Sequence, residues 1–133
     1  MAGETSLSTL LRSMNPVLND GAYVFCTLAG REALQGLEPL GSFHEREGLT
    51  VILPQQDAER LGLTVDYVAA WITLEVHSAL SAVGLTAAVA GALAAVGISC
   101  NVVAAYYHDH LFVAQVDGAR ALDALRHLAQ TAE

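Results

Sequence analysis

The stretch from Val76 to Tyr107 contains no aspartate, glutamate, lysine or arginine, and it constrains the fold more than any other feature of the sequence. A membrane-spanning helix needs about 20 strongly apolar residues in succession. This stretch consists mostly of alanine, glycine, serine, threonine and valine instead, and Asn101 interrupts it. We therefore predict a buried helix followed by a buried strand, and no membrane partner. Because 53% of the 133 residues are apolar, the chain can form a hydrophobic core.

A strand and a helix are expected at the start of the second half of the chain. Residues 71–77 alternate between apolar and polar side chains, which is typical of a half-buried strand. The next apolar residues recur with helical spacing and form one stripe. That stripe consists of Leu85, Val89, Leu93 and Val96. Gly97 is well placed to end the helix.

Two further strands and a final helix complete the second half. Residues 98–107 and 111–116 are β-branched or aromatic-rich, so we predict two strands joined by a turn at His108–His110. Asp117 could cap the last helix through its carboxylate. The order strand, helix, strand, strand, helix is that of a ferredoxin-like unit that lacks only its last strand. The expected class is α+β, with helices on one face of an antiparallel sheet.

The first half looks like a looser version of the same unit. The expected elements are a helix over 7–14, a strand over 23–28, a hairpin of 41–47 and 49–53 about Gly48, and a helix over 55–61. Gly36 and Pro39 interrupt the crossover between the first strand and the hairpin, so its helix must be short. We expect two tandem units, a degenerate one over residues 1–66 and a second over 67–133. The helix over 7–14 has no sheet of its own, which suggests that the units exchange elements.

Charge and cysteine content exclude several kinds of function. Six arginines and no lysine face 14 carboxylates, which argues against a nucleic-acid partner. Without lysine the chain has no Schiff-base or P-loop chemistry. Cys26 and Cys100 stand in apolar, strand-like runs without metal-ligand spacing, so free thiols in a reducing compartment are expected. The N-terminus lacks a signal-peptide pattern. These features predict a cytoplasmic protein with no cofactor.

Three segments resemble a bacterial family of small ACT-domain proteins. They are LLRSMNPVLNDGAYVFCTL, EREGLTVILP and WITLEVHSALSAVGLTAAVAGALAAVGISCNVVAAYYHDHLFV. The resemblance covers nearly the whole chain and implies two tandem ACT domains with a ferredoxin-like fold. Similar tandem arrangements occur in the arginine sensor of animal nutrient signalling and in the regulatory part of aspartate kinases. This implies an amino acid as the ligand, bound between two ACT units.

The resemblance places this ligand against the loop before the helix of residues 85–96. The implied ligand-binding residues are Ser78, Val83, Gly84, Leu85, Thr86, Asn101 and Val102. Free N–H groups at a helix start suit a carboxylate, and Gly84 allows close approach to the backbone. Asn101 and Val102 would come from the facing unit. Each position also has a structural explanation: a tight turn at Gly84, helix capping by Ser78 and Thr86, and a strand-end hydrogen bond at Asn101.

A second candidate site consists of His108, Asp109 and His110. Two histidines and a carboxylate can form part of a metal site, and His77 could approach as a third imidazole. The alternative is a solvated turn in which Asp109 sets the turn and the histidines pack on tyrosines. Trp71 should lie on the sheet face opposite the helices, either as a contact surface or covered by the first half of the chain.

Three classes of function remain after these exclusions. The first, which we favour, is a regulatory protein that binds a small ligand, an amino acid by the resemblance. The second is an interaction module that forms a homodimer or binds another protein. An enzyme is the weakest hypothesis because no nucleophile–base pair or phosphate-binding loop is present in the sequence.

Overall fold

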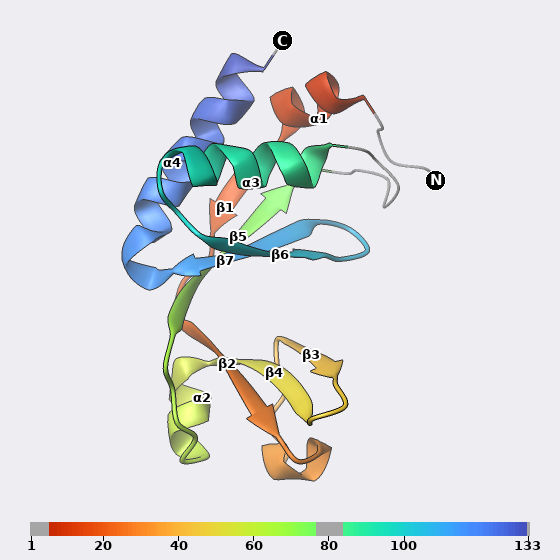
Figure 1. Cartoon of the computed structure of the whole chain (residues 1–133), viewed down its shortest axis with the longest axis vertical. Coiled ribbons are helices and arrows are strands. Elements are labelled where there is room, and N and C mark those ends of the chain that lie inside the picture. The colour runs from red at the N-terminus through yellow and green to blue at the C-terminus, as the bar shows by residue number, and fades with distance from the viewer. Residues whose placement is uncertain (1–5, 77–83, 133) are drawn as a thin grey trace. The chain divides into compact units, whose positions relative to one another are not determined.

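The structure is a computed structural model, and it describes residues 6–76 and 84–132. The chain forms two compact units. Residues 1–20 and 70–133 belong to the larger unit, and residues 21–69 form the smaller one (Figure 1). In the described parts of the chain, no helix has the length and apolarity needed to cross a membrane.

The larger unit contains two segments that are distant in the sequence. Its N-terminal elements are α1 (Leu7–Ser13) and β1 (Asn15–Leu18). The others are β5 (Val68–Glu75), α3 (Leu85–Ala95), β6 (Cys100–Ala104), β7 (Asp109–Ala114), the 3-10 turn η2 (Gln115–Asp117) and α4 (Gly118–Thr131). Its strands follow the order β1, β5, β7, β6. The predicted strand–helix–strand–strand–helix order is therefore confirmed.

Strand β1 supplies the strand that the second half of the chain lacks. It pairs antiparallel with β5, from Asn15 opposite Glu75 to Leu18 opposite Ile72. With β1 counted last, the larger unit is a complete βαββαβ unit of the ferredoxin type. The expected exchange of elements is thus confirmed, and the exchanged segment includes a strand that the sequence did not predict.

The core of the larger unit lies between its sheet and its helices. Leu10 of α1, Ile72 and Leu74 of β5, Leu93 of α3 and Leu125 of α4 belong to one buried cluster and are at most 1% exposed. Side chains on a strand alternate between the two faces of its sheet. Trp71 and Thr73 of β5 consequently point to the face opposite these helices, as predicted. We call this the open face of the sheet.

The smaller unit repeats the same order of elements in reduced form. It contains β2 (Tyr23–Leu28), the 3-10 helix η1 (Arg31–Leu34), β3 (Gly41–His44), β4 (Leu49–Pro54) and α2 (Gln55–Arg60). Its last strand is the beginning of β5, where Tyr23 of β2 pairs with Ala69. The first crossover helix has only four residues, which confirms the expected interruption by Gly36 and Pro39. The core includes Val24, Leu28, Leu34, Val51, Leu53 and Ala58.

Two local predictions in the second half were wrong. The β6–β7 hairpin turns at residues 105–108, where the Ala105 N–H donates to the His108 carbonyl over 3.0 Å. Tyr106 and Tyr107 therefore occupy the exposed turn, while Asp109 and His110 begin β7. The Asp117 carboxylate does not cap α4; it forms an ion pair with the Arg120 guanidinium at 3.1 Å.

Candidate functional site

Helix α3 begins at a glycine with a left-handed backbone. Gly84 occupies the N-cap position with φ of 97°, and its carbonyl accepts the first helical hydrogen bond from Ala88 over 2.8 Å. The two residues that follow it differ in exposure. Leu85 is only 2% exposed and packs in the core, whereas Thr86 is exposed to solvent. As a glycine, Gly84 has no side chain to cap this helix start, and no other described residue is seen to do so. The first N–H groups of α3 therefore lack an intrahelical partner.

Leu7 of α1 lies directly against Gly84. A Cβ added to Gly84 would come within 3.2 Å of the Leu7 Cδ2 atom, which is tighter than ordinary van der Waals contact. The backbone angle at this position favours glycine, and a larger residue would also require the end of the Leu7 side chain to shift. On this side the α3 start is covered by the chain itself. The predicted site residues Ser78 and Val83 lie outside the described residues.

Asn101 and Val102 lie on β6, away from the start of α3. Asn101 pairs with Phe112 and is exposed, while Val102 pairs with Leu111 and packs against the core of the larger unit. Strand β6 begins beneath the C-terminal end of α3 and runs back along the helix (Figure 1). Within the larger unit, Asn101 and Gly84 are therefore not brought together.

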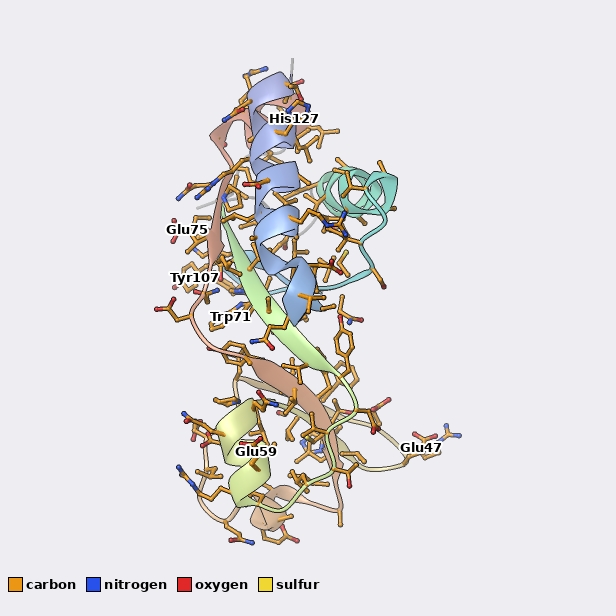
Figure 2. All side chains as sticks on the ribbon, turned by 90° about the vertical axis from the view of Figure 1, so that its left-hand side faces the viewer. Glu47, Glu59, Trp71, Glu75, Tyr107 and His127 are labelled. Atoms are coloured by element: carbon orange, nitrogen blue, oxygen red, sulfur yellow. The ribbon has the colours of Figure 1, made fainter. Side chains whose placement is uncertain are left out.

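A polar cluster occupies the open face of the sheet, and the sequence did not predict it. The Trp71 Nε1–H donates to His110 Nδ1 over 3.0 Å, and the Thr73 hydroxyl lies 3.1 Å from the same nitrogen. The Asn19 amide donates to Thr73 Oγ1 over 3.0 Å and to the Trp71 carbonyl over 3.2 Å. Figure 2 labels Trp71 and Glu75, which share this face of β5. We call Asn19, Trp71, Thr73 and His110 the open-face cluster.

These contacts determine the protonation state of His110. Its Nδ1 accepts the indole hydrogen bond, so a neutral ring must have its proton on Nε2. Burial lowers the pKa of His110, the nearby His108 lowers it further, and Asp109 opposes both. The side chain is consequently favoured in its neutral form, and the cluster is a packed hydrogen-bonded network.

The predicted histidine and aspartate triad does not converge. Asp109 and His110 are successive residues of β7 and point to opposite faces of the sheet. Asp109 is 8% exposed, and burial raises its pKa while the two histidines oppose that shift. His110 packs on Trp71, with 5.7 Å between ring centroids, rather than on the tyrosines. Among the described residues, no three histidine, cysteine or acidic side chains are grouped to hold a metal ion; His77 lies outside them.

Comparisons with known proteins match two successive segments of the chain. Residues 2–70 match one ACT-domain family, and residues 67–127 match a second. A Vibrio cholerae protein of unknown function, described as a possible transport protein, is 50% identical, with a TM-score of 0.86 over 95% of this chain and 98% of that one. No curated protein matches the sequence.

More distant structures share the fold alone. An Agrobacterium tumefaciens protein is 18% identical, with a TM-score of 0.63 over 87% of this chain and 89% of that one. The regulatory subunit of aspartate kinase from Thermus thermophilus, in its ligand-free form, is 11% identical, with a TM-score of 0.66 over 87% of this chain and 99% of that subunit. The α+β fold with tandem ACT-type units is therefore shared with aspartate kinase regulatory subunits.

Proposed function

Because the chain belongs to the ACT-domain family, we propose that it is a regulatory protein that binds an amino acid at the start of α3 and catalyses no reaction. ACT domains are typically regulatory modules that bind small ligands such as amino acids. The observation that supports this site is the start of α3 at Gly84, an N-cap residue that has no capping side chain of its own.

The chemistry of this helix start suits the carboxylate of an amino acid. Helix α3 has 11 residues, so its aligned peptide dipoles give a partial positive charge at Leu85 and Thr86. Free N–H groups there can donate to a carboxylate, and the exposed Thr86 hydroxyl can add a further donor. Ser78 and Val83 remain part of the proposed site. Because Asn101 and Val102 lie away from Gly84 in the same unit, we propose that they contact the ligand from a second ACT unit.

Titration calorimetry of the full chain against each proteinogenic amino acid tests this proposal. We expect one or a few related amino acids to bind and to stabilise the fold, by about 2.7 kcal/mol at a hundredfold excess over Kd. Thr86→Val should weaken binding because it removes a hydroxyl donor from an exposed position. Thr131→Val makes the same change at the far end of α4 and should bind normally. Flat heats for every amino acid with folded protein would contradict the proposal.

A second candidate function is self-association through the outer face of α3. Ala87, Gly91 and Ala94 are exposed, and the helix contains no charged residue; Val96, expected on the buried stripe, follows the end of α3 and is also exposed. A helix that is apolar all round is normally buried, so we propose this face as a homodimer contact. Sedimentation analysis should show a dimer that Ala94→Glu converts to a monomer. A monomer at every concentration tested would contradict this function. It would also remove Asn101 and Val102 from the amino-acid site, because they could reach Gly84 only from a second copy of the chain, but it would leave the proposed contacts at the start of α3 untested by this experiment alone and still open to calorimetry.

A further inference from the structure

An open pocket of about 320 Å³ lies at the opposite end of α1 from Leu7. It is formed by the last turn of α1, the start of β1 and the last turns of α4, all within the larger unit. Figure 1 shows α1 beside the C-terminal part of α4. No single stretch of the sequence predicts this pocket, because its lining residues come from near both ends of the chain.

The lining combines two cations with an apolar floor. Arg12 and Arg126 are the only charged side chains among its lining residues. Gln130 adds an amide group, while the Asn15 amide already donates to the Glu75 carboxylate over 3.0 Å. Met14, which is 4% exposed, and the half-buried Ala129 provide apolar surface. In a chain with 14 carboxylates and six arginines, a pocket lined by two arginines and no carboxylate is a local reversal of charge.

Arg12 and Arg126 differ from Arg60 and Arg120, which form ion pairs with neighbouring aspartates. Arg120 donates to the Val96 carbonyl over 2.7 Å and pairs with Asp117, while Arg60 pairs with Asp57 at 3.7 Å. In the described part of the chain, neither Arg12 nor Arg126 has an ion-pair partner. Their guanidinium groups are thus available to a bound anion.

Arg12 stands in the last turn of α1 and Arg126 before the last turn of α4, and among the described residues neither guanidinium is seen to bond to a helix carbonyl. A basic residue in a last helical turn can bond to the terminal carbonyls. In α1, the Ser13 hydroxyl donates to the Thr9 and Leu10 carbonyls over 2.8 and 3.2 Å. In α4, the Thr131 hydroxyl donates to the His127 carbonyl over 2.9 Å. Hydroxyl groups therefore already bond to carbonyls near both helix ends.

We propose that this pocket binds a small organic dicarboxylate. A planar guanidinium matches a carboxylate with two parallel hydrogen bonds, so two arginines from different helices fit a ligand with two such groups. The apolar floor of Met14 and Ala129 suits a short methylene chain between them. This site is separate from the proposed amino-acid site at Gly84 and requires different residues.

Calorimetry of the full chain with glutarate at low ionic strength tests the site. We expect saturable binding that weakens as salt is added, because the contacts are charge-assisted. Arg12→Gln and Arg126→Gln should each lower the affinity by about tenfold or more. Arg46→Gln, a matched change on the smaller unit, should leave the affinity unchanged. Thr86→Val should also leave glutarate binding unchanged, which separates this test from that of the amino-acid site.

Neutral and inorganic probes define the ligand class. Glutaramide has the shape of glutarate without its charge and should not bind, and inorganic phosphate should bind more weakly than glutarate. If either variant fails to fold, glutarate should still shift the arginine Nε–H resonances of Arg12 and Arg126 in NMR spectra of the unchanged protein. The proposal is overturned by absent glutarate binding, by binding that both glutamine variants retain, or by phosphate binding at least as tightly as glutarate.

Discussion

The two units share one topology but differ in their helices. In the larger unit the crossover helix α3 has 11 residues and the last helix α4 has 14. The corresponding elements of the smaller unit, η1 and α2, have four and six. An anion site at a helix start needs aligned peptide dipoles and several free N–H groups. The proposed amino-acid site can therefore form at α3 and not at η1, although both units have the same fold.

The larger unit also depends on the N-terminal segment for its completion. Strand β1 pairs with residues 72–75 of β5, and α1 packs against the core that α3 and α4 share. The beginning of β5 is at the same time the last strand of the smaller unit. Neither half of the sequence therefore contains all of the elements of the larger unit.

The largest expected effect follows removal of an N-terminal core side chain. Leu10 of α1 is fully buried in the core of the larger unit. Leu10→Ala should lower the free energy of unfolding by about 2–5 kcal/mol through lost burial and a residual cavity. Urea unfolding followed by the fluorescence of Trp71, the only tryptophan, reports on this unit.

Leu7 provides the control for this change on the same helix. It is 37% exposed, so Leu7→Ala should cost about 1 kcal/mol or less. A loss below about 1 kcal/mol for Leu10→Ala, or equal losses for the two variants, would show that the N-terminal segment is not an integral part of the larger unit.

Gly84 and Gly36 offer a matched pair of glycines from the two units. Both have left-handed backbones, with φ of 97° and 85°. A Cβ at Gly84 would also meet Leu7, whereas none of the described atoms lies within 4 Å of one at Gly36. Each alanine substitution should lower the free energy of unfolding by about 1 kcal/mol or more through backbone strain. The decrease should be larger for Gly84→Ala than for Gly36→Ala.

Thermal or urea unfolding of the two variants measures this difference. The double variant Leu7→Ala/Gly84→Ala should recover the part of the loss that comes from the side-chain contact. If Gly84→Ala lowers the free energy of unfolding no more than Gly36→Ala does, the packing of α1 against the start of α3 leaves room for a Cβ at Gly84. The predicted difference between the two glycines would then be wrong.

Local periodicity explains how much of the fold the sequence could predict. The helical stripe of Leu85, Val89 and Leu93 predicted α3 nearly to the residue. The alternation around Trp71 predicted β5 as a strand, although β5 starts three residues earlier and ends two residues earlier than expected. Strand β1 was missed because it has only four residues, includes Pro16, and is defined by pairing with the distant β5. The division of the sequence at residues 66 and 67 stays a prediction; the two family matches overlap at residues 67–70.

The candidate sites were less predictable than the fold, for a related physical reason. The resemblance to ACT-domain proteins indicated Gly84, and a glycine before an apolar helical stripe is a local pattern that agrees with it. The open-face cluster joins Asn19, Thr73 and His110 across three separate segments, and the pocket of Arg12 and Arg126 joins the two ends of the chain. Such sites depend on strand register and helix packing, which have no signature in a single stretch of sequence.

The smallest expected effect concerns the pH dependence of the open-face cluster. The pKa of His110 is lowered in the folded protein, chiefly by burial, so below its ordinary value of 6.5 the unfolded chain binds a proton more readily than the folded one. The stabilising contribution is therefore complete above about pH 6.5 and is lost as pH falls below it. Protonation of Nδ1 would also break the hydrogen bond from Trp71.

Unfolding curves at about pH 7.5 and about pH 5 should show this loss, and His110→Gln should reduce it. His44 of the smaller unit is exposed, so His44→Gln should keep the full pH dependence of the unmodified protein. The raised pKa of Asp109 affects stability in the opposite direction. Its contribution to the stability of the folded protein is complete below its ordinary pKa of 3.8 and is lost as pH rises through its folded pKa. A pH dependence that His110→Gln leaves intact and His44→Gln removes would place the titrating group in the smaller unit and reverse the contrast between the two.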